Sequence, residues 1–415
     1  MKITDIVYKS YDEVRDMPRF DLQSMPKKPK WYLQVLAWIL ALPETFSVRP
    51  KIRKHKMEDV KGPFIMLCNH NSFLDFKIAT RAVFPKRSTY IVAVDGFIGR
   101  EGIMRNVGCF AKRKFLSDSV IVRQIKHAID ESKVICQIYP EARYSLVGTN
   151  SELPESLSKL IKMTQYPVVS LISHGHHLRQ PFWNLNKRKL KTSTDMTYIL
   201  SPEQIQKLSV KEITKIVNDA FYYDDYKYQL ENTIHIKEPF RAEGLHKPLY
   251  KCPHCGKDHV MDSKDNTLFC TSCNVVYEMD TLGRLSNKNG DTKFTHVPDW
   301  FEWQRKEVKK EIEQGNYNVS LEVDIDMLPN NTGFYRVGSG TLIHNENGFT
   351  LQGDGFTIEK PVQANFGVHI EYDYFGRGDG ISFSTKEDTF YVYPKDQNYS
   401  ATKFHFATEE LYRLK

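Results

Sequence analysis

The chain has 415 residues, of which 40% are hydrophobic and 26% charged, and its net charge is +7. At about 150 residues per domain this length predicts two or three domains, and the ordinary composition excludes a collagenous, a wholly disordered and a polytopic membrane protein. The charge is uneven, because residues 316–415 contain 8 Lys and Arg against 14 Asp and Glu. The excess of basic residues therefore lies in residues 1–315.

Residues 1–57 form a basic, amphipathic segment with an apolar run from Trp31 to Leu42. Residues 26–57 hold eight Lys and Arg and a single acid, Glu44. A bilayer-spanning helix needs about 20 residues, so the run fits either a core helix or a helix at a membrane interface. The basic flanks favour the interface, because anionic lipids attract Lys and Arg. We expect no secretory signal peptide, since residues 1–25 lack an apolar h-region.

Residues 58–235 alternate apolar strands with helical patterns, which predicts an α/β domain with a mixed sheet flanked by helices. Strands are expected at 64–68, 89–94, 134–138 and 166–172. Helices are expected at 72–83 and 119–131, and a third should begin after the capping box formed by Ser209 and Glu212.

Four of the seven cysteines form two CxxC pairs separated by 14 residues. A reducing compartment is expected without a secretory signal, so we do not expect disulfides. This spacing predicts a zinc ribbon over residues 250–280, in which four thiolates hold one structural Zn²⁺. The predicted ligands are Cys252, Cys255, Cys270 and Cys273.

His254 and His259 lie beside these pairs, but a complete cysteine set makes them bystanders. The charges of lysines and aspartates around the pairs cancel, so the ribbon has no basic stripe that could bind a nucleic-acid backbone. No nucleic-acid partner is expected. The ribbon is therefore expected to be a structural element or a docking site for a protein partner.

The last segment, residues 316–415, is predicted to be a small all-β domain, barrel- or sandwich-like, preceded by a linker helix within 300–315. Apolar residues alternate with polar ones from Val319 to Ile325, and further alternating runs lie at 368–374, 390–392 and 404–406. Glycine-bearing turns separate these runs, and a short helix is expected at 409–414.

A histidine and a carboxylate follow the first predicted strand. His70 lies at a strand-to-helix turn, and Asp75 comes five residues later in the first turns of the helix. A carboxylate in this position can hold one ring nitrogen and leave the other as a general base. The pattern alone also fits a helix-capping His beside a surface Asp.

Three further blocks follow in order, and with His70 and Asp75 they resemble the glycerolipid acyltransferase family, the lysophosphatidate acyltransferase type. The blocks are Gly108-Cys-Phe-Ala-Lys-Arg113, Tyr139-Pro-Glu-Ala-Arg-Tyr-Ser145 and Tyr166-Pro-Val-Val169. The resemblance covers residues 30–235 or so. It implies an enzyme that acylates a lysophospholipid from acyl-CoA or acyl carrier protein. The helix at 31–42 and its basic flanks make the cytoplasmic face of a membrane, with peripheral attachment, the expected location.

The resemblance also implies roles for individual residues. His70 is expected to be the general base and Asp75 to hold its ring, with direct attack of an acceptor hydroxyl on the thioester. Phosphate binding is expected from the basic residues of the second and third blocks. The substrate-binding set is Lys112, Arg113, Glu141, Arg143 and Ser145.

Two departures from the family's pattern bear on the acceptor. Glu141 and Arg143 are separated by one residue where the family's Phe-Pro-Glu-Gly-Thr-Arg-Ser block has two. The second block is a residue short before its arginine, so Lys112, Arg113 and Lys114 remain alternatives for the phosphate-facing position. A surface ion pair between Glu141 and Arg143 is the structural alternative.

Other interpretations stay open. The cluster His174-Gly-His-His177 fits a metal site or a polar loop lining the donor site, and we favour the loop. An acyl-enzyme through Cys68 or Cys109 is the less favoured route. The alternative to an enzyme is a non-catalytic lipid-binding or scaffold protein on an acyltransferase fold. Retention of both His70 and Asp75 favours catalysis.

Overall fold

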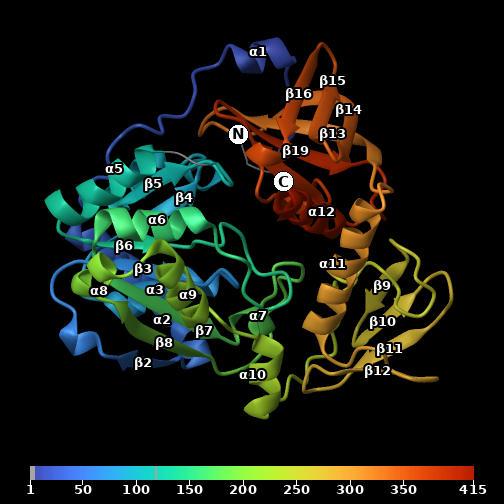
Figure 1. Ribbon diagram of the computed structural model, residues 1–415, viewed down its shortest axis with the longest axis horizontal. Coiled ribbons are helices and arrows are strands. Elements are labelled where there is room, and N and C mark those ends of the chain that lie inside the picture. The colour runs from blue at the N-terminus through green and yellow to red at the C-terminus, as the bar shows by residue number, and fades with distance from the viewer. Residues whose placement is uncertain (1–4, 117–118) are drawn as a thin grey trace.

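A computed structural model describes residues 5–116 and 119–415, which fold around three β-sheets (Figure 1). The first is a seven-stranded sheet of order β2-β8-β7-β3-β6-β4-β5. Five strands are parallel, β8 is antiparallel to β7, and β2 is parallel to β8, so the predicted mixed sheet is confirmed. Its strands are β2 (Lys51–His55), β3 (Ile65–Cys68), β4 (Ser88–Ala93), β5 (Cys109–Lys112), β6 (Ile135–Ile138), β7 (Val168–His174) and β8 (Ser193–Leu200).

Helices cover both faces of this sheet, as burial of parallel strands on both sides requires. Apolar residues of α5, α6, α8 and α9 pack on one face, and α3 packs on the other with α2 outside it. The helices of this α/β domain are α2 (Trp31–Val48), α3 (Leu74–Val83), α4 (Glu101–Val107), α5 (Val120–Lys126), α6 (Glu155–Thr164), α7 (His176–Arg179), α8 (Pro202–Lys207), α9 (Val210–Ala220) and α10 (Asp225–Glu231). The capping box of Ser209 and Glu212 is present at the start of α9.

Helix α2 is longer than the apolar run that predicted it. It continues through Pro43 to Val48, although a proline removes one intrahelical hydrogen bond. Packing against α3 and the charge of Glu44 hold the extra turn, because this half-buried carboxylate pairs with Lys77 and with Lys187 at 2.8 Å. The only acid of residues 26–57 therefore attaches α2 to the rest of the α/β domain.

The second sheet lies in the predicted ribbon. It has four antiparallel strands, β9 (Met261–Lys264), β10 (Thr267–Cys270), β11 (Val276–Met279) and β12 (Leu285–Asn287). The predicted linker helix follows as α11 (Val297–Glu313). Trp300 of α11 is fully buried and its ring contacts Tyr277 of β11, so the helix packs directly on the ribbon.

The third sheet forms the C-terminal β domain. Its order is β16-β15-β14-β13-β19-β18-β17, so the outermost described strands are not paired with each other and the sheet is open. The strands are β13 (Val319–Leu328), β14 (Tyr335–Asn345), β15 (Gly348–Gly353), β16 (Phe356–Pro361), β17 (His369–Glu371), β18 (Gly380–Ser384) and β19 (Thr389–Pro394). The expected barrel or sandwich is thus replaced by one antiparallel sheet with a helix packed on it.

That helix, α12 (Ala401–Leu414), corrects one prediction. Phe404 and Phe406 were assigned to a strand and the helix to 409–414 only, but both phenylalanines are fully buried inside a 14-residue helix. Ser400 caps it by accepting a hydrogen bond from Thr402 N. Alternation over three residues is too short to distinguish a strand from one turn of a buried helix.

The N-terminal residues pack on the C-terminal β domain. Strand β1 (Val7–Tyr8) pairs with β14, and α1 (Tyr11–Arg15) stacks its Tyr11 on Phe356 at 4.1 Å between ring centroids. Arg19 then pairs with Asp388 at 3.0 Å. The two ends of the chain are therefore joined in one structural unit, as the blue and red ribbons of Figure 1 show.

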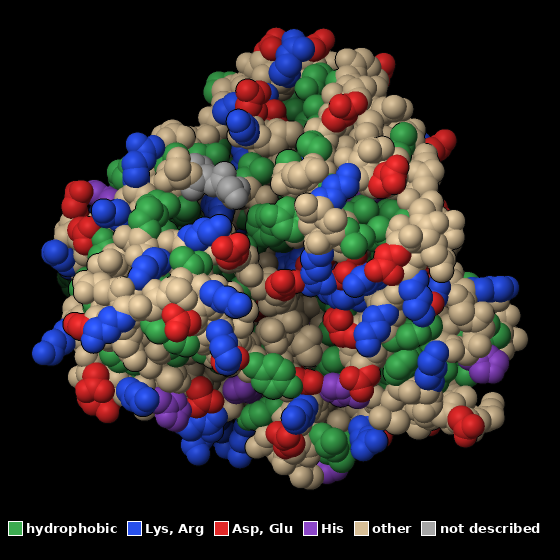
Figure 2. Space-filling view, viewed as in Figure 1, with side chains coloured by type: hydrophobic (Ala, Val, Ile, Leu, Met, Phe, Trp, Pro, Cys, Tyr) green, Lys and Arg blue, Asp and Glu red, His purple; other side chains and the backbone are tan. Residues whose placement is uncertain are grey.

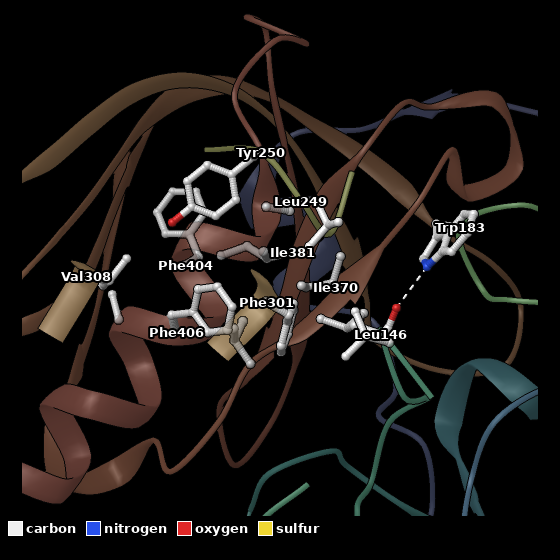
Figure 3. Close-up of a cluster of buried hydrophobic side chains, with 14 of the residues drawn as sticks. Leu146, Trp183, Leu249, Tyr250, Phe301, Val308, Ile370, Ile381, Phe404 and Phe406 are labelled. Carbon is white, nitrogen blue, oxygen red and sulfur yellow. Dashed lines mark hydrogen bonds between the residues drawn. The ribbon is translucent and has the colours of Figure 1, made fainter. Parts of the chain in front are cut away.

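One hydrophobic cluster joins the ribbon sheet and the C-terminal sheet to loops and helices of the α/β domain. Leu146 and Trp183 of the α/β domain lie in the same buried cluster as Tyr250 near the ribbon and Phe301 of α11. Figure 3 shows part of this cluster, with the Trp183 indole donating to Leu146 O at 2.8 Å. Because a large apolar contact fixes the relative position of domains, the C-terminal half is a rigid neighbour of the α/β domain.

Candidate functional site

The candidate site begins where the central strand β3 ends. Asn69 joins β3 to β7, since its side chain donates to Ser173 O and accepts from Ser173 N, both at 2.9 Å. His70 follows at the carboxyl end of the parallel strands, the edge where open α/β sheets place their sites. The His70 side chain is about one-fifth exposed.

Asp75, in the first turn of α3, orients the His70 ring. Its Oδ2 lies 3.0 Å from His70 Nδ1 and also accepts from the backbone N–H groups of Asn71 and Ser72. Burial opposes the charge of Asp75, but hydrogen bonds from two imidazoles outweigh it and lower the pKa to about 2. An ionised carboxylate only accepts, so Nδ1 of His70 is the donor and Nε2 carries the lone pair.

The second imidazole belongs to His176, the first residue of α7. Its Nδ1 lies 2.6 Å from Asp75 Oδ1, and the residue is fully buried. Asp225 of α10 positions α7 by accepting from Gly175 N and His177 N at 2.9 and 3.1 Å. The sequence predicts a polar loop in this region and does not indicate the contact of His176 with Asp75, because only the fold brings β7 beside β3.

The other histidines of that cluster have different surroundings. The ring of His174 stacks on Tyr228 at 5.0 Å, and His177 is buried among Trp183 and Tyr226. Among the described residues, metal-ligand clustering is found at the four ribbon cysteines and not at these histidines. The cluster is thus divided between three environments, and one member reaches the His70 site.

The third block supports the backbone of His70. Glu141 Oε1 accepts from His70 N at 3.4 Å, and its Oε2 accepts from Ser151 N at 2.9 Å. Ser145 N donates to His70 O at 2.7 Å, while its hydroxyl donates to Thr149 O. Burial raises the pKa of Glu141 to about 7, which these donors and Arg143 only partly offset. Glu141 and Ser145 therefore hold the turn that carries His70 in place.

Two tyrosines of the same block flank the imidazole. The ring of Tyr144 lies 3.9 Å from that of His70 between centroids, and the ring of Tyr139 lies at 4.5 Å. Within residues 5–116 and 119–415, no protein group is hydrogen-bonded to His70 Nε2. The ring is thus packed against two tyrosine rings and held at Nδ1, and Nε2 has no hydrogen-bond partner among the described residues.

The predicted phosphate-binding arginines are buried against the C-terminal β domain. Arg113 donates to Thr389 Oγ1 at 3.0 Å and to Glu387 O. Arg143 forms a buried ion pair with Glu409 of α12 rather than with Glu141, so it is not the surface pair considered as the alternative. Lys112, at the end of β5, is half-buried.

Cysteine nucleophiles are disfavoured by their surroundings. Burial raises the pKa of Cys109 to about 12, and burial with the charge of Asp75 raises that of Cys68. A thiol that stays protonated at neutral pH is a poor nucleophile. The surroundings of Cys68 and Cys109 therefore do not favour a cysteine nucleophile.

The four ribbon cysteines converge on one point. Their Sγ atoms all lie within 4.8 Å of one another, with 3.7 Å between Cys252 and Cys273 and 3.8 Å between Cys255 and Cys270. Tetrahedral thiolates at about 2.3 Å from Zn²⁺ would be about 3.8 Å apart. His259 is not part of this set, since its Nδ1 accepts from Ser400 N and its ring packs against Tyr250. The cluster can hold a metal ion.

An apolar surface lies on the outer side of α2. Six large side chains there are about half exposed or more, namely Trp31, Tyr32, Leu36, Ile39, Leu40 and Phe46. Phe73 and Phe76, just after His70, are also exposed. No helix in the described part of the chain has the length and apolar character needed to cross a bilayer.

Comparisons with known proteins agree with the block pattern. Residues 51–174, which contain all four blocks, match the family model described as Acyltransferase. A similar solved structure is the 1-acyl-sn-glycerophosphate (LPA) acyltransferase PlsC from Thermotoga maritima, with 16% identity and a TM-score of 0.37 over 48% of this chain and 80% of that one. The search of curated proteins returned no match.

The contact between His176 and Asp75 predicts that His176 is a positioning residue. His176→Ala removes a hydrogen bond to a buried carboxylate, worth about 1.5–3 kcal/mol, so we expect kcat to fall about tenfold to a hundredfold. His176→Asn keeps a donor near the Nδ1 position and should recover most of the loss. Steady-state acyl-transfer assays would measure this. Equal activity of both variants and the wild type would contradict the role.

Proposed function

Because the chain belongs to the acyltransferase family through residues 51–174, we propose that it transfers a fatty acyl group from acyl-CoA or acyl carrier protein to a lysophospholipid hydroxyl. The observation that carries this proposal is the His70–Asp75 pair at the carboxyl end of β3, with a 3.0 Å contact at Nδ1. A fixed imidazole with a free Nε2 is the arrangement that a general base needs.

The reaction follows from this geometry. The acceptor hydroxyl oxygen attacks the thioester carbonyl carbon while His70 Nε2 takes the hydroxyl proton. The tetrahedral intermediate collapses with cleavage of the carbon–sulfur bond, and the imidazolium returns its proton to the departing thiolate. The charge of Asp75, kept ionised by its four donors, stabilises the imidazolium between these steps. No covalent enzyme intermediate is formed.

The residues that the family resemblance assigns to phosphate binding have hydrogen-bond partners within the protein. The resemblance implies a lysophosphatidate-like acceptor held by Arg113, Lys112, Glu141, Arg143 and Ser145. In the structure Glu141 and Ser145 bond to the His70 backbone, and the two arginines have partners in the C-terminal β domain. The proposal therefore includes acceptors other than lysophosphatidate. A scaffold without activity is the alternative, and the intact His70–Asp75–His176 contacts favour an enzyme.

We further propose that the enzyme works at the cytoplasmic face of a membrane, attached peripherally through α2. The exposed apolar side chains of α2 and the flanking Lys and Arg suit an interfacial helix. Phe73 and Phe76, which follow His70 in the sequence, are two further exposed apolar side chains. A lipid acceptor would then reach the site without leaving the membrane surface.

We also propose that the ribbon binds one Zn²⁺ with a structural role. The two Sγ–Sγ distances of 3.7 and 3.8 Å match a tetrahedral thiolate set. Backbone N–H groups of Ser272 and Cys273 lie 3.4 Å from Cys270 Sγ, which stabilises a thiolate. The ion would supply positive charge that keeps the thiolates deprotonated, and the ribbon would keep its contacts with α11.

Replacing the proposed base tests the activity. Acyl transfer from radiolabelled acyl-CoA and acyl carrier protein to lysolipids should fall about 10²–10⁴-fold in His70→Ala. His127→Ala, a change on a helix away from the site, serves as the matched control. Wild-type protein that acylates no acceptor, or a His70→Ala variant that keeps full activity, would contradict the proposal.

Membrane attachment is tested by exposed positions of α2. Leu40→Glu with Phe46→Glu removes two apolar side chains from the proposed lipid contact, each worth about 1.5–3 kcal/mol. Pelleting with anionic liposomes should therefore weaken at least about tenfold. Leu185→Glu, an exposed apolar position outside α2, should pellet like the wild type. Unchanged pelleting of the double variant would contradict membrane attachment through α2.

Metal content tests the ribbon. Elemental analysis should find one zinc ion per chain, and Cys255→Ser should lose it and lower Tm by on the order of 10 °C. His254→Ala changes an exposed neighbour of the same pair and should keep both zinc and Tm. Zinc-free wild-type protein with an unchanged Tm after chelation would contradict a structural metal.

A further inference from the structure

Carboxylates and other oxygens of the C-terminal β domain already partner the basic residues of the second and third blocks. Arg113 donates to Thr389 and Glu387, and Arg143 pairs with Glu409. Arg113 and Arg143 are both less than a tenth exposed. To bind a phosphate monoester as the family resemblance implies, these arginines would have to contact the phosphate of the ligand. Here they already contact oxygen atoms of the protein itself.

Lys114, the third candidate cation, is held between two carboxylates. Its Nζ lies 3.6 Å from Glu371 of β17 and 3.7 Å from Asp95. Glu371 is 1% exposed, and burial raises its pKa to about 7 against the opposing influence of Lys114. A phosphate monoester brings a charge of about −1.5 to −2. Binding it there would take Lys114 from Glu371 and Asp95, and the charges of Asp95 and Glu409 would repel it in a buried site.

The C-terminal β domain also reaches toward His70 through aromatic rings. Tyr144, which packs on His70, stacks on Phe182 at 4.9 Å, and Phe182 contacts His369 and Tyr372 at 6.1 and 5.9 Å. Both of these last residues belong to or follow β17. These ring contacts connect the C-terminal β domain to the side of the imidazole on which Tyr144 packs.

The C-terminal β domain is packed permanently on the α/β domain and is not a lid that opens and closes. Tyr90 and Phe97 of the α/β domain share a buried cluster with Leu328, Phe334 and Tyr391 of the C-terminal β domain. Asp95 also accepts from Tyr374 and Tyr391 at 2.9 and 3.3 Å across the same boundary. Separating the domains would expose this cluster to water. The contacts of Arg113 and Arg143 with the C-terminal β domain are therefore present in the active enzyme as well. In Figure 2 charged side chains of both signs gather around the hollow between the two halves.

We propose that the C-terminal β domain forms one wall of the acceptor site and selects lysolipids that carry no phosphate monoester, such as phosphodiester or uncharged lysolipids. This inference rests on the proposed acyltransferase function and narrows its acceptor. Arg113 Nε and Arg143 Nη1 are buried without partners. The N–H groups of these two nitrogens suit a neutral oxygen, such as a headgroup hydroxyl or an ester carbonyl, while the adjacent carboxylates repel a dianion.

The test compares acceptors with one acyl chain at equal surface concentration. Lysophosphatidate is set against lysophosphatidylglycerol, lysophosphatidylethanolamine, lysophosphatidylcholine and monoacylglycerol, with acyl-CoA and acyl carrier protein as donors. We expect kcat/KM for the best acceptor without a phosphate monoester to exceed that for lysophosphatidate by at least about tenfold. Lysophosphatidate as the best acceptor would overturn the proposal while leaving the acyltransferase function intact. If the protein acylates none of these acceptors, both the proposed acyltransferase function and this inference are wrong.

A variant tests the role of the wall itself. Glu371→Gln keeps the shape of the side chain and removes its charge, so the ratio of lysophosphatidate to lysophosphatidylglycerol turnover should rise about tenfold. Glu322→Gln, an exposed position on β13, is the matched control and should leave the ratio unchanged. A folded Glu371→Gln variant with the wild-type ratio would overturn the assignment of β17 to the acceptor wall.

Discussion

The arrangement of the site depends on the carboxylate of Asp75. It is buried and yet ionised, because two backbone N–H groups and the rings of His70 and His176 all donate to it. These four contacts fix the turn between β3 and α3, the tautomer of His70 and the position of α7. A buried charge without such donors would cost several kcal/mol, so the same interaction that stabilises the turn also orients the proposed base, His70.

Most of the α/β domain could be predicted from sequence because its signals are local. Buried strands such as β3 and β6 are short apolar runs, and α9 begins at a capping box, so the structure confirms these elements within a few residues. The weaker elements β2, β5 and β8 were missed, since their sequences mix charged and apolar residues. Helix α12 was assigned partly to a strand because the alternation of Phe404 and Phe406 covers only three residues.

The candidate site was predicted where its residues are close in sequence and missed where they are distant. His70 and Asp75 are five residues apart, whereas His176 reaches Asp75 only because β7 pairs with β3. The partners of Arg113 and Arg143 lie more than 250 residues away in the C-terminal β domain. No sequence motif indicates such contacts. They place two arginines that were expected to bind phosphate in a domain interface, which is the basis of the proposed limit on the acceptor's charge.

The hydrogen-bonded state of the imidazoles tests this account most directly. In protein labelled with ¹⁵N-histidine, proton–nitrogen correlation spectra at neutral pH should show His70 as the Nδ1–H tautomer, with a low-field, exchange-protected proton, assigned by its loss in His70→Ala. His176 should show a second such proton, because both rings donate from Nδ1 to Asp75. A His70 ring protonated only at Nε2, or exchanging freely at Nδ1, would contradict the claim that Asp75 prepares His70 as the base.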